Sequence, residues 1–258
     1  MAMKNFRLRK MEQYILEKES ASMEELCSEF EISMNTARLD VAELVEKGTI
    51  KKVYGGVTAN RENALVPFTE REMKNAAAKK SVCCMAASFV EDGDIIYIDS
   101  GTTAMYMVDY LKEKKNITVL THNLNAITRA VPLSELNVFS LPGNLDRRNN
   151  SFVSADTARI LERYNIKKAF IATAGVGADG TVTNSSPLEF EVKKAAMANA
   201  YEKYLLLDAS KYGRTSLMTF AKLSDMTRVI VDSGITNDFR DYCAMNNVAL
   251  SVAPKARE

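Results

Sequence analysis

The stretch of sequence that decides the fold lies at residues 95–103 and reads IIYIDSGTT. Its four large apolar residues predict a buried strand, and residues 99–103 predict a small turn that leads into a helix beginning near Thr103. Such a junction gathers free backbone N–H groups, the positive end of a helix dipole and three hydroxyl donors at the carboxyl edge of a sheet. These groups suit the phosphate of a small monoester, and an ordinary helix cap explains the turn equally well. The chain lacks Gly-x-x-x-x-Gly-Lys here, which argues against a nucleotide P-loop.

Beyond residue 90, short β-branched strands alternate with helical stretches. The expected strands are residues 94–98, 117–121, 137–141, 168–173, 204–207, 228–231 and 249–252. The expected helices are residues 103–112, 123–130, 155–164, 188–201 and 237–245. This alternation predicts an α/β fold, with a mainly parallel sheet covered by helices on both faces.

The first 57 residues show a different pattern, in which short helices precede a β-rich segment. The helices are expected at residues 5–19, 23–30 and 34–47, and the β-rich segment at residues 49–57. Ser22 and Glu25 form a capping box, Gly48 is a helix stop, and Gly55-Gly56 can turn a strand pair. The pattern predicts a winged helix-turn-helix.

A polar stretch separates this domain from the rest of the chain. Residues 58–63 and Pro67 interrupt any regular pattern, and a helix rich in alanine and lysine is expected from near Thr69 to about Val90. We therefore divide the chain into a DNA-binding domain at residues 1–57, a linker with the start of a connecting helix at residues 58–74, and a sensor domain at residues 75–258.

Residues 23–47 have the anatomy of a helix-turn-helix, because a tight turn joins a short helix to one whose first turns are polar. Side chains on those turns can meet base edges or phosphates, and the wing can reach the flanking DNA backbone. The residues expected to bind DNA are Ser33, Asn35, Thr36, Arg38, Lys51, Lys52 and Tyr54. The alternative is a helical hairpin used for dimerisation, in which Arg38 and Asp40 form a solvated charge pair.

The composition excludes some classes of protein but does not identify the function. The chain has 258 residues, 47% of them hydrophobic, and its net charge of +1 leaves nucleic acid, membranes and small anions open as partners. No apolar run reaches the ~18 residues that cross a bilayer, and the start lacks the apolar centre of a signal peptide. The four cysteines form no C-x-x-C pair and His122 is the single histidine, so we expect reduced thiols, no metal, no cofactor and a cytoplasmic protein.

The N-terminal domain resembles that of DeoR-family transcriptional regulators. The family pattern has a serine, then Thr-Ile-Arg-Arg-Asp-Leu, then Leu-Glu-x-x-Gly, and Arg-x-His-Gly-Gly in the wing. Here the same places read Ser33, TARLDV at residues 36–41, LVEKG at residues 44–48 and KVYGG at residues 52–56. Leu39 replaces the second arginine, and acidic residues slightly outnumber basic ones in residues 1–57. The resemblance implies DNA binding with a modest or strongly salt-dependent affinity for phosphate.

Residues from about 75 to 253 resemble the C-terminal sensor domain of the same family, which shares its fold with ribose 5-phosphate isomerase. The matching motifs are Gly93-Asp94, DSGTT at residues 99–103, TVLT at 118–121, Pro142-Gly143, AFI at 169–171 with Gly175, Glu189 with Lys193, and DASK at 208–211. The resemblance implies that a phosphorylated sugar or related metabolite binds as an effector. The effector-binding residues that it implies are Asp99, Ser100, Gly101, Thr102, Thr103, Thr121, His122, Gly143, Gly175, Glu189 and Lys211.

The resemblance also implies a role for each group of these residues. Residues 100–103 would hold the phosphate, Asp99 and Thr121 would orient sugar hydroxyls, Gly143 and Gly175 would permit close backbone approach, and Lys211 would add charge. Two departures from the family pattern adjoin the expected pocket, His122 in place of an asparagine and Asn144 in place of a glycine. His122 lies just past a strand end, where ligands bind, and a lone histidine is also often structural.

The interpretation that includes all these features is a DNA-binding transcriptional regulator and not an enzyme. We expect a repressor of carbohydrate-metabolism genes that acts as a homodimer or homotetramer and whose affinity for its DNA operator is modulated by a phosphorylated sugar. The alternative is a sugar-phosphate isomerase with a helical appendage, for which Glu189 is the candidate general base. A protein-interaction adaptor would leave the hydroxyl-rich turn without a purpose.

Overall fold

The computed structural model describes residues 2–46, 49–59 and 68–255. The chain divides into two compact units, Met1–Val66 and Pro67–Glu258, and each is described by itself. The expected helix stop at Gly48 and most of the expected linker, residues 60–67, lie outside the described residues. Among the helices that the structure describes, none is long and apolar enough to cross a membrane.

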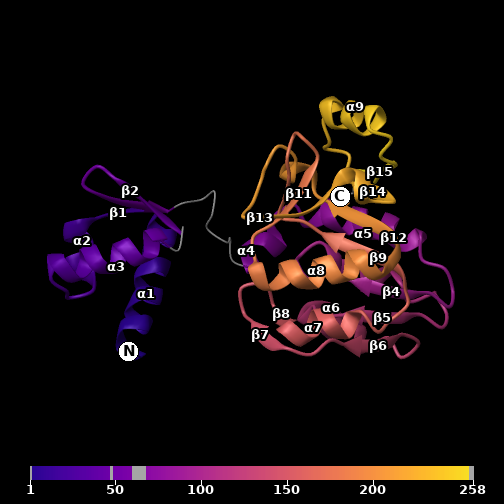
Figure 1. The fold of residues 1–258 in the computed structure, drawn as a ribbon, viewed down its shortest axis with the longest axis horizontal. Coiled ribbons are helices and arrows are strands. Elements are labelled where there is room, and N and C mark those ends of the chain that lie inside the picture. The colour runs from indigo at the N-terminus through magenta and orange to yellow at the C-terminus, as the bar shows by residue number, and fades with distance from the viewer. Residues whose placement is uncertain (1, 47–48, 60–67, 256–258) are drawn as a thin grey trace. The chain divides into compact units, whose positions relative to one another are not determined.

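The first unit combines helices with a small antiparallel sheet (Figure 1). The helices are α1 (Ala2–Lys18), α2 (Met23–Glu29) and α3 (Met34–Glu46), and the strands are β1 (Ser20–Ser22), β2 (Ile50–Val53) and β3 (Gly56–Ala59). The predicted capping box of Ser22 and Glu25 is present at the start of α2. Sequence analysis predicts only the two wing strands, whereas β1 adds a third by pairing with β3.

An ion pair joins α1 to α3 inside this unit. Arg7 Nε donates to Asp40 Oδ2 over 2.6 Å, and Arg7 Nη2 donates to Oδ1 over 3.2 Å. Asp40 is only 1% exposed, and its hydrogen bond raises the pKa of Arg7. The Asp40 carboxylate therefore helps to hold the helices together, and the solvated Arg38–Asp40 pair of the helical-hairpin alternative is wrong.

The second unit is built on a seven-stranded sheet whose pairings are all parallel, in the order β15-β14-β12-β9-β4-β5-β6. The strands are β4 (Ile95–Ile98), β5 (Thr118–Thr121), β6 (Asn137–Ser140), β9 (Ile166–Ala172), β12 (Ala200–Leu207), β14 (Arg228–Val231) and β15 (Leu250–Val252). These are the seven strands that the sequence predicts, with shifted ends. The predicted α/β fold with a parallel sheet is confirmed.

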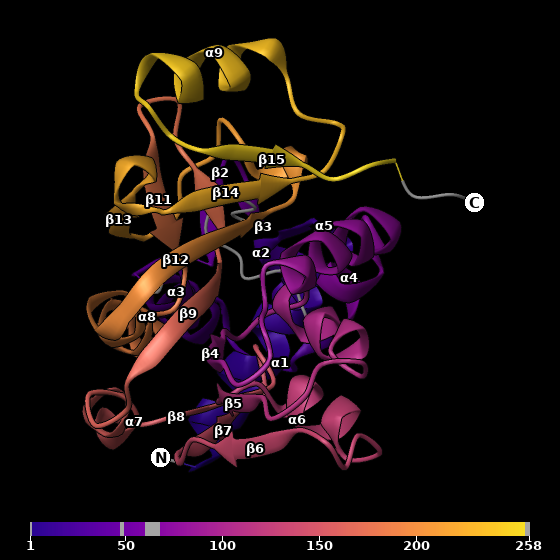
Figure 2. The ribbon, with the colours of Figure 1, turned by 90° about the vertical axis from the view of Figure 1, so that its right-hand side faces the viewer.

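Helices cover both faces of the sheet (Figure 2). One face carries α5 (Ala76–Ser88), the 3-10 helix η1 (Ala104–Tyr110) and α6 (Leu124–Ala130), and the other carries α7 (Ala155–Leu161), α8 (Pro187–Asn199) and α9 (Asn237–Met245). Apolar residues of the central strands alternate between the two cores, so that Ile96 and Ile98 pack on the first and Tyr97 on the second. The end of β4 is consequently fixed from both sides.

Short elements that the sequence did not predict add to the loops after the parallel strands. They are the pair β7 (Asn144–Asp146) and β8 (Ser151–Val153), the small sheet of β10 (Gly175–Val176), β11 (Thr181–Asn184) and β13 (Met218–Lys222), and the turns η2 (Ala209–Lys211) and η3 (Leu223–Asp225). The β7–β8 pair and β10 follow the carboxyl ends of β6 and β9. They build up the edge of the sheet at which the sequence predicts a ligand.

Two helical predictions need correction. The single helix expected from near Thr69 to about Val90 is two helices, α4 (Phe68–Met73) and α5, because Asn75 adopts a left-handed conformation with φ of 55° between them. The segment after the hydroxyl-rich turn is the 3-10 helix η1, and the Thr103 side chain makes no capping hydrogen bond to the described residues. The explanation of this turn as an ordinary helix cap therefore fails.

Candidate functional site

The first turn of α3 contains residues that build the helix and residues that face outward. Thr36 N donates to Ser33 Oγ over 3.2 Å, and the two hydroxyl oxygens lie 3.0 Å apart. This pair satisfies a backbone donor at the start of the helix. Asn35 and Arg38 are exposed instead. The amide and the guanidinium can therefore reach a partner, while the hydroxyls of Ser33 and Thr36 are engaged locally.

The wing presents the other residues that the sequence assigns to DNA binding. Lys51, Lys52 and Tyr54 are all exposed, on β2 or at the tip of the β2–β3 turn. Gly55 follows Tyr54 with φ of 80°, a conformation that glycine adopts without strain and that the tight turn requires. The structure thus places two cations and an aromatic ring on one projection of the same unit as α3.

In the second unit, Asn123 holds the backbone of the turn at residues 99–103. Its Nδ2 donates to Asp99 O over 3.1 Å and to Gly101 O over 3.2 Å, while its Oδ1 caps α6. Gly101 has φ of 98°, which disfavours any residue with a side chain. Asn123 is not among the predicted site residues, although an asparagine directly before an apolar helical stretch is a typical N-cap. The shape of the turn is therefore fixed by the protein itself.

Asp99 belongs to a buried ionic network on the α8 side of the turn. Lys193 of α8 pairs with Asp99 Oδ2, and the two side chains are 2% and 0% exposed. Ala172 N donates to the same oxygen over 2.8 Å, and Tyr97 OH donates to Oδ1 over 3.2 Å. Both carboxylate oxygens are engaged within the chain, so Asp99 anchors the turn to β9 and α8.

His122 extends this network beyond Tyr97. Its Nδ1 lies 3.1 Å from Tyr97 OH, and since the hydroxyl proton points to Asp99, Nδ1 carries a proton and donates to the hydroxyl. Nε2 is then an acceptor, buried and without a hydrogen-bond partner among the described residues. Burial lowers the pKa of His122, with Asp99 and Glu189 opposing the shift, so the ring is neutral.

On the α5 side of the turn, a lysine that the sequence did not single out reaches the hydroxyls. Lys79 Nζ donates to Thr102 Oγ1 over 3.1 Å and also to Arg71 O. Lys79 is 2% exposed, and burial lowers its pKa. The hydroxyl of Thr103 is buried and has no hydrogen-bond partner among the described residues. A cation therefore reaches the hydroxyl of Thr102, and the unpartnered hydroxyl of Thr103 follows in the next residue.

Lys211 brings a second lysine to this edge of the sheet. Its Nζ donates to Thr173 O, 2.7 Å away at the end of β9. Burial lowers the pKa of Lys211 to about 8, and the cations of Lys79, Arg71 and Lys193 act in the same direction against Asp208. Three other cations thus lie close enough to Lys211 to disfavour its charge. An anion bound among them would be strongly attracted.

The connecting helices α4 and α5 supply part of this charge. Arg71 Nη2 donates to Asn149 Oδ1 over 2.8 Å, and burial lowers the pKa of Arg71. Asn75 Nδ2 donates to both carboxylate oxygens of Asp208, at 3.1 and 3.0 Å. The segment that directly follows the first unit is therefore part of the site. Sequence analysis missed Arg71, Asn75 and Lys79, because a lysine-rich helix shows no signal for which of its polar residues point inward.

Thr121 and Glu189 have partners within the chain. Thr121 Oγ1 donates to Ile98 O over 2.7 Å, which links β5 to β4. Glu189 is buried at the start of α8, and its Oε1 accepts from Ser151 Oγ over 3.0 Å. The Thr121 hydroxyl therefore donates to the backbone of the neighbouring strand, whereas Glu189 contacts a side chain.

The two glycines of the predicted site permit close packing of the chain against itself. A Cβ added at Gly143 would lie 2.5 Å from Val153 N, and one added at Gly175 would lie 2.4 Å from Arg214 O. Both distances are shorter than a carbon can approach. These glycines are therefore required by the β7–β8 pair and by the loop before β13, whatever ligand the site holds.

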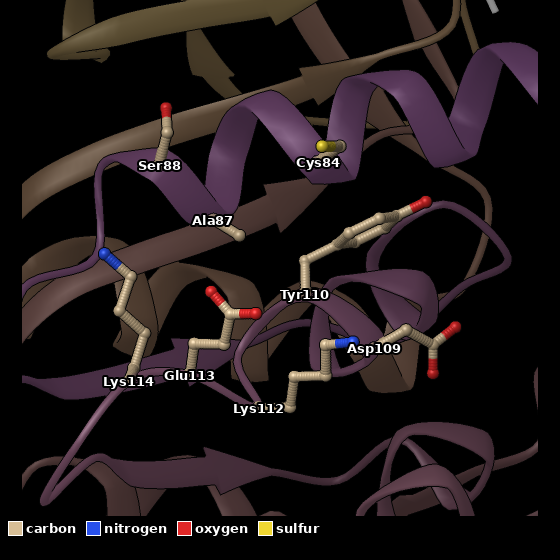
Figure 3. Close-up of a pocket in the computed structure, with 8 residues that line it drawn as sticks. All are labelled: Cys84, Ala87, Ser88, Asp109, Tyr110, Lys112, Glu113 and Lys114. Atoms are coloured by element: carbon tan, nitrogen blue, oxygen red, sulfur yellow. The ribbon is translucent and has the colours of Figure 1, made fainter. Parts of the chain in front are cut away.

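A surface hollow lies elsewhere, lined by residues of α5, of η1 and of the segment after η1, as Figure 3 shows. It has a volume of about 360 Å³ and is lined by Cys84, Ala87, Ser88, Asp109, Tyr110, Lys112, Glu113 and Lys114. Lys112 to Lys114 precede β5, so this hollow faces the amino edge of the sheet. Its lysines are balanced by two carboxylates. The cations and hydroxyls of the opposite edge are the better candidate for a ligand site.

Two family models match the chain. The DeoR-like helix-turn-helix domain matches residues 7–63, and the DeoR C terminal sensor domain matches residues 74–233. The first range lies within the first structural unit and the second range within the second unit.

The chain is also similar to individual proteins and to solved structures. The HTH-type transcriptional regulator IolR of Bacillus subtilis is 39% identical over 251 residues, which cover 97% of this chain and 100% of that protein. The Lactose phosphotransferase system repressor of Staphylococcus epidermidis is 27% identical over 231 residues, 88% of this chain and 91% of the repressor. The solved structure of ribose 5-phosphate isomerase A from Methanocaldococcus jannaschii is 20% identical, with a TM-score of 0.41 over 54% of this chain and 55% of that chain.

Proposed function

The chain belongs to the DeoR family of DNA-binding transcriptional regulators, and from that premise we propose that it represses carbohydrate-metabolism genes in response to a phosphorylated sugar or related metabolite. The observation that carries the effector proposal is the hydrogen bond of Lys79 to Thr102, with the cations of Lys211 and Arg71 nearby and the unpartnered hydroxyl of Thr103 next along the turn. Cations and hydroxyl donors on a fixed turn match the charge and the acceptor oxygens of a phosphate monoester.

Within this proposal the residues divide into those that touch the effector and those that shape the site. Ser100, Gly101, Thr102 and Thr103 hold the phosphate together with Lys79, Lys211 and Arg71, and His122 and Glu189 face the sugar hydroxyls. Asp99, Thr121, Gly143 and Gly175 shape the pocket, because their side chains or backbones are engaged within the chain.

We further propose that the site binds its ligand without transforming it. A general base must be free to accept a proton from the substrate. Asp99 is not free to do so, because both of its carboxylate oxygens are engaged within the chain. The similar proteins named above, a transcriptional regulator and a repressor, support regulation over catalysis. Binding to two operator half-sites would require a homodimer or homotetramer.

The effector proposal predicts a change in thermal stability. We expect phosphorylated sugars such as ribose 5-phosphate, screened one at a time, to include one that raises the melting temperature by a few degrees. At ~100 times the dissociation constant, binding adds about 2.7 kcal/mol to the free energy of unfolding. Differential scanning calorimetry on the full chain measures the shift.

The unphosphorylated parent sugar and two variants serve as controls. The parent should leave the melting temperature unchanged, since the turn recognises the phosphate. Thr102→Val with Thr103→Val removes the hydroxyls and should abolish the rise, whereas Thr128→Val on the exposed side of α6 should retain it. A double variant that responds like the unmodified chain would disprove the role of the turn.

We propose that α3 and the wing contact DNA through Asn35, Arg38, Lys51, Lys52 and Tyr54, with Ser33 and Thr36 supporting the start of α3. Arg38→Ala is expected to weaken operator binding by about 1–3 kcal/mol if the guanidinium reads a base, or to reduce the salt dependence by about one unit if it binds phosphate. Fluorescence anisotropy at several salt concentrations distinguishes the two. Unchanged affinity and unchanged salt dependence, with the fold intact, would remove Arg38 from the interface.

A further inference from the structure

The outward face of α3 carries two polar and two apolar residues at helical spacing. Asn35, Arg38, Leu39 and Ala42 are all exposed, at positions i, i+3, i+4 and i+7. Leu39 is 63% exposed, although leucine elsewhere on α3, at Leu44, is fully buried. The inward face holds Ala37, Asp40, Val41 and Leu44. Leu39 therefore plays no part in the core of the unit, and its side chain is presented beside two groups suited to reading bases.

We propose that Leu39, with Ala42 beside it, reads the C5-methyl group of a thymine in the major groove of the operator. This rests on the proposed placement of α3 on DNA. On the major-groove edges of the four base pairs, the thymine methyl is the one apolar group. A leucine side chain has no hydrogen-bond donor or acceptor, so it cannot form hydrogen bonds with the edges of the bases. Burial of the methyl against Leu39 removes apolar surface of both partners from water.

The neighbouring residues and the charge of the unit favour this contact. Asn35 and Arg38 carry the groups that pair with adenine and guanine edges, and a placement of α3 that brings them to the bases brings Leu39, on the same face, to the bases as well. Acidic residues slightly outnumber basic ones in residues 1–57, which limits what phosphate contacts can contribute to affinity. A larger share of the recognition then depends on the base edges.

The test replaces thymine by uracil, which lacks only the methyl group. An operator is first selected by the full chain from a pool of random double-stranded DNA, and each thymine of the selected site is then replaced in turn. In the unmodified chain, at least one replacement per half-site should weaken binding about four-fold, the equivalent of one buried methyl group. In Leu39→Ala the same replacement should have little effect, because the partner of the methyl is gone.

Two further variants complete the experiment. Phe6→Ala removes an apolar side chain of similar exposure, 62%, from α1 and should leave the pattern of methyl-sensitive thymines unchanged. Leu39→Arg supplies a bidentate donor and should select guanine in place of thymine at that position.

The outcomes separate this inference from the placement of α3. If no thymine loses its methyl sensitivity in Leu39→Ala, or if Leu39→Arg selects the same base as the unmodified chain, the Leu39 contact is wrong. If Arg38→Ala still weakens binding in that case, α3 remains on the DNA and only the Leu39 contact fails. If neither Arg38 nor Leu39 matters, the placement of α3 fails as well.

Discussion

Replacing Lys193 by methionine is expected to lower the free energy of unfolding of the second unit by about 3–5 kcal/mol. The substitution keeps most of the side-chain volume but leaves the buried Asp99 carboxylate without its cation. Ala172 O also loses the hydrogen bond that Lys193 Nζ donates over 2.9 Å. An unpaired buried charge costs far more than the ion pair contributes, so the effect should be among the largest of any single substitution in the chain. Calorimetric melting of the full chain measures it.

A neighbouring lysine and a double variant test the physical reason. Lys194 follows Lys193 on α8 but is exposed, so Lys194→Met should change the stability by less than about 0.5 kcal/mol. Combining Lys193→Met with Asp99→Asn removes the stranded charge and should recover part of the loss. If Lys193→Met is as stable as the unmodified chain, or if the double variant is no more stable than the single one, Asp99 is not held by the pair in the way described.

The sequence predicts the parallel sheet well because the signal for each of its strands is local. Residues 95–98 and 229–231 are apolar on both faces, as strands covered by helices on two sides must be, and each is followed by small or polar residues. The capping box at Ser22 is likewise contained within four residues. Where neighbours along the chain determine the structure, inference from the residues succeeds.

The parts that the sequence missed depend on contacts between distant residues. Asn75 interrupts the connecting helix, and its side chain donates a hydrogen bond to Asp208, which lies far along the chain. No local sequence pattern predicts that hydrogen bond. Lys79 is buried against Thr102, whereas Lys74 and Lys80 in the same stretch are exposed. The tertiary arrangement alone decides which lysine of an alanine- and lysine-rich helix enters the site.

The buried network around Asp99 also depends on contacts between residues that are distant in the sequence. Glu189 and Lys193 are one helical turn apart, which places them on one face of α8 and is visible in the sequence. That Lys193 pairs with Asp99, and that Tyr97 links Asp99 to His122, follows only once α8 packs across the end of β4. The sequence therefore predicts the hydroxyl-rich turn at the end of β4, but not which of the surrounding residues are engaged in holding that turn.

Replacing Lys211 by methionine is expected to weaken binding of the phosphorylated effector by about 2 kcal/mol at pH 7, about 30-fold. It is also expected to change the pH dependence. The pKa of Lys211 is about 8, below its ordinary value, so the lysine is charged below pH 8 and loses its charge as the pH rises through that value. A phosphate monoester is dianionic above about pH 6. Affinity in the unmodified chain should therefore be highest between about pH 6 and 8 and fall at higher pH.

In Lys211→Met the decline above pH 8 should disappear, because the group that titrates there is gone, whereas the decline below pH 6 should remain because it belongs to the phosphate. Lys222→Met removes an exposed lysine of β13 and should preserve both the acidic and the alkaline decline in affinity.

Isothermal titration calorimetry in two buffers of different protonation enthalpy adds an independent measure of the same titration. A bound dianion raises the pKa of Lys211, so binding near pH 8 to 9 should take up a proton in the unmodified chain but not in Lys211→Met. An alkaline decline or a proton uptake that persists in Lys211→Met would show that another group titrates in the site.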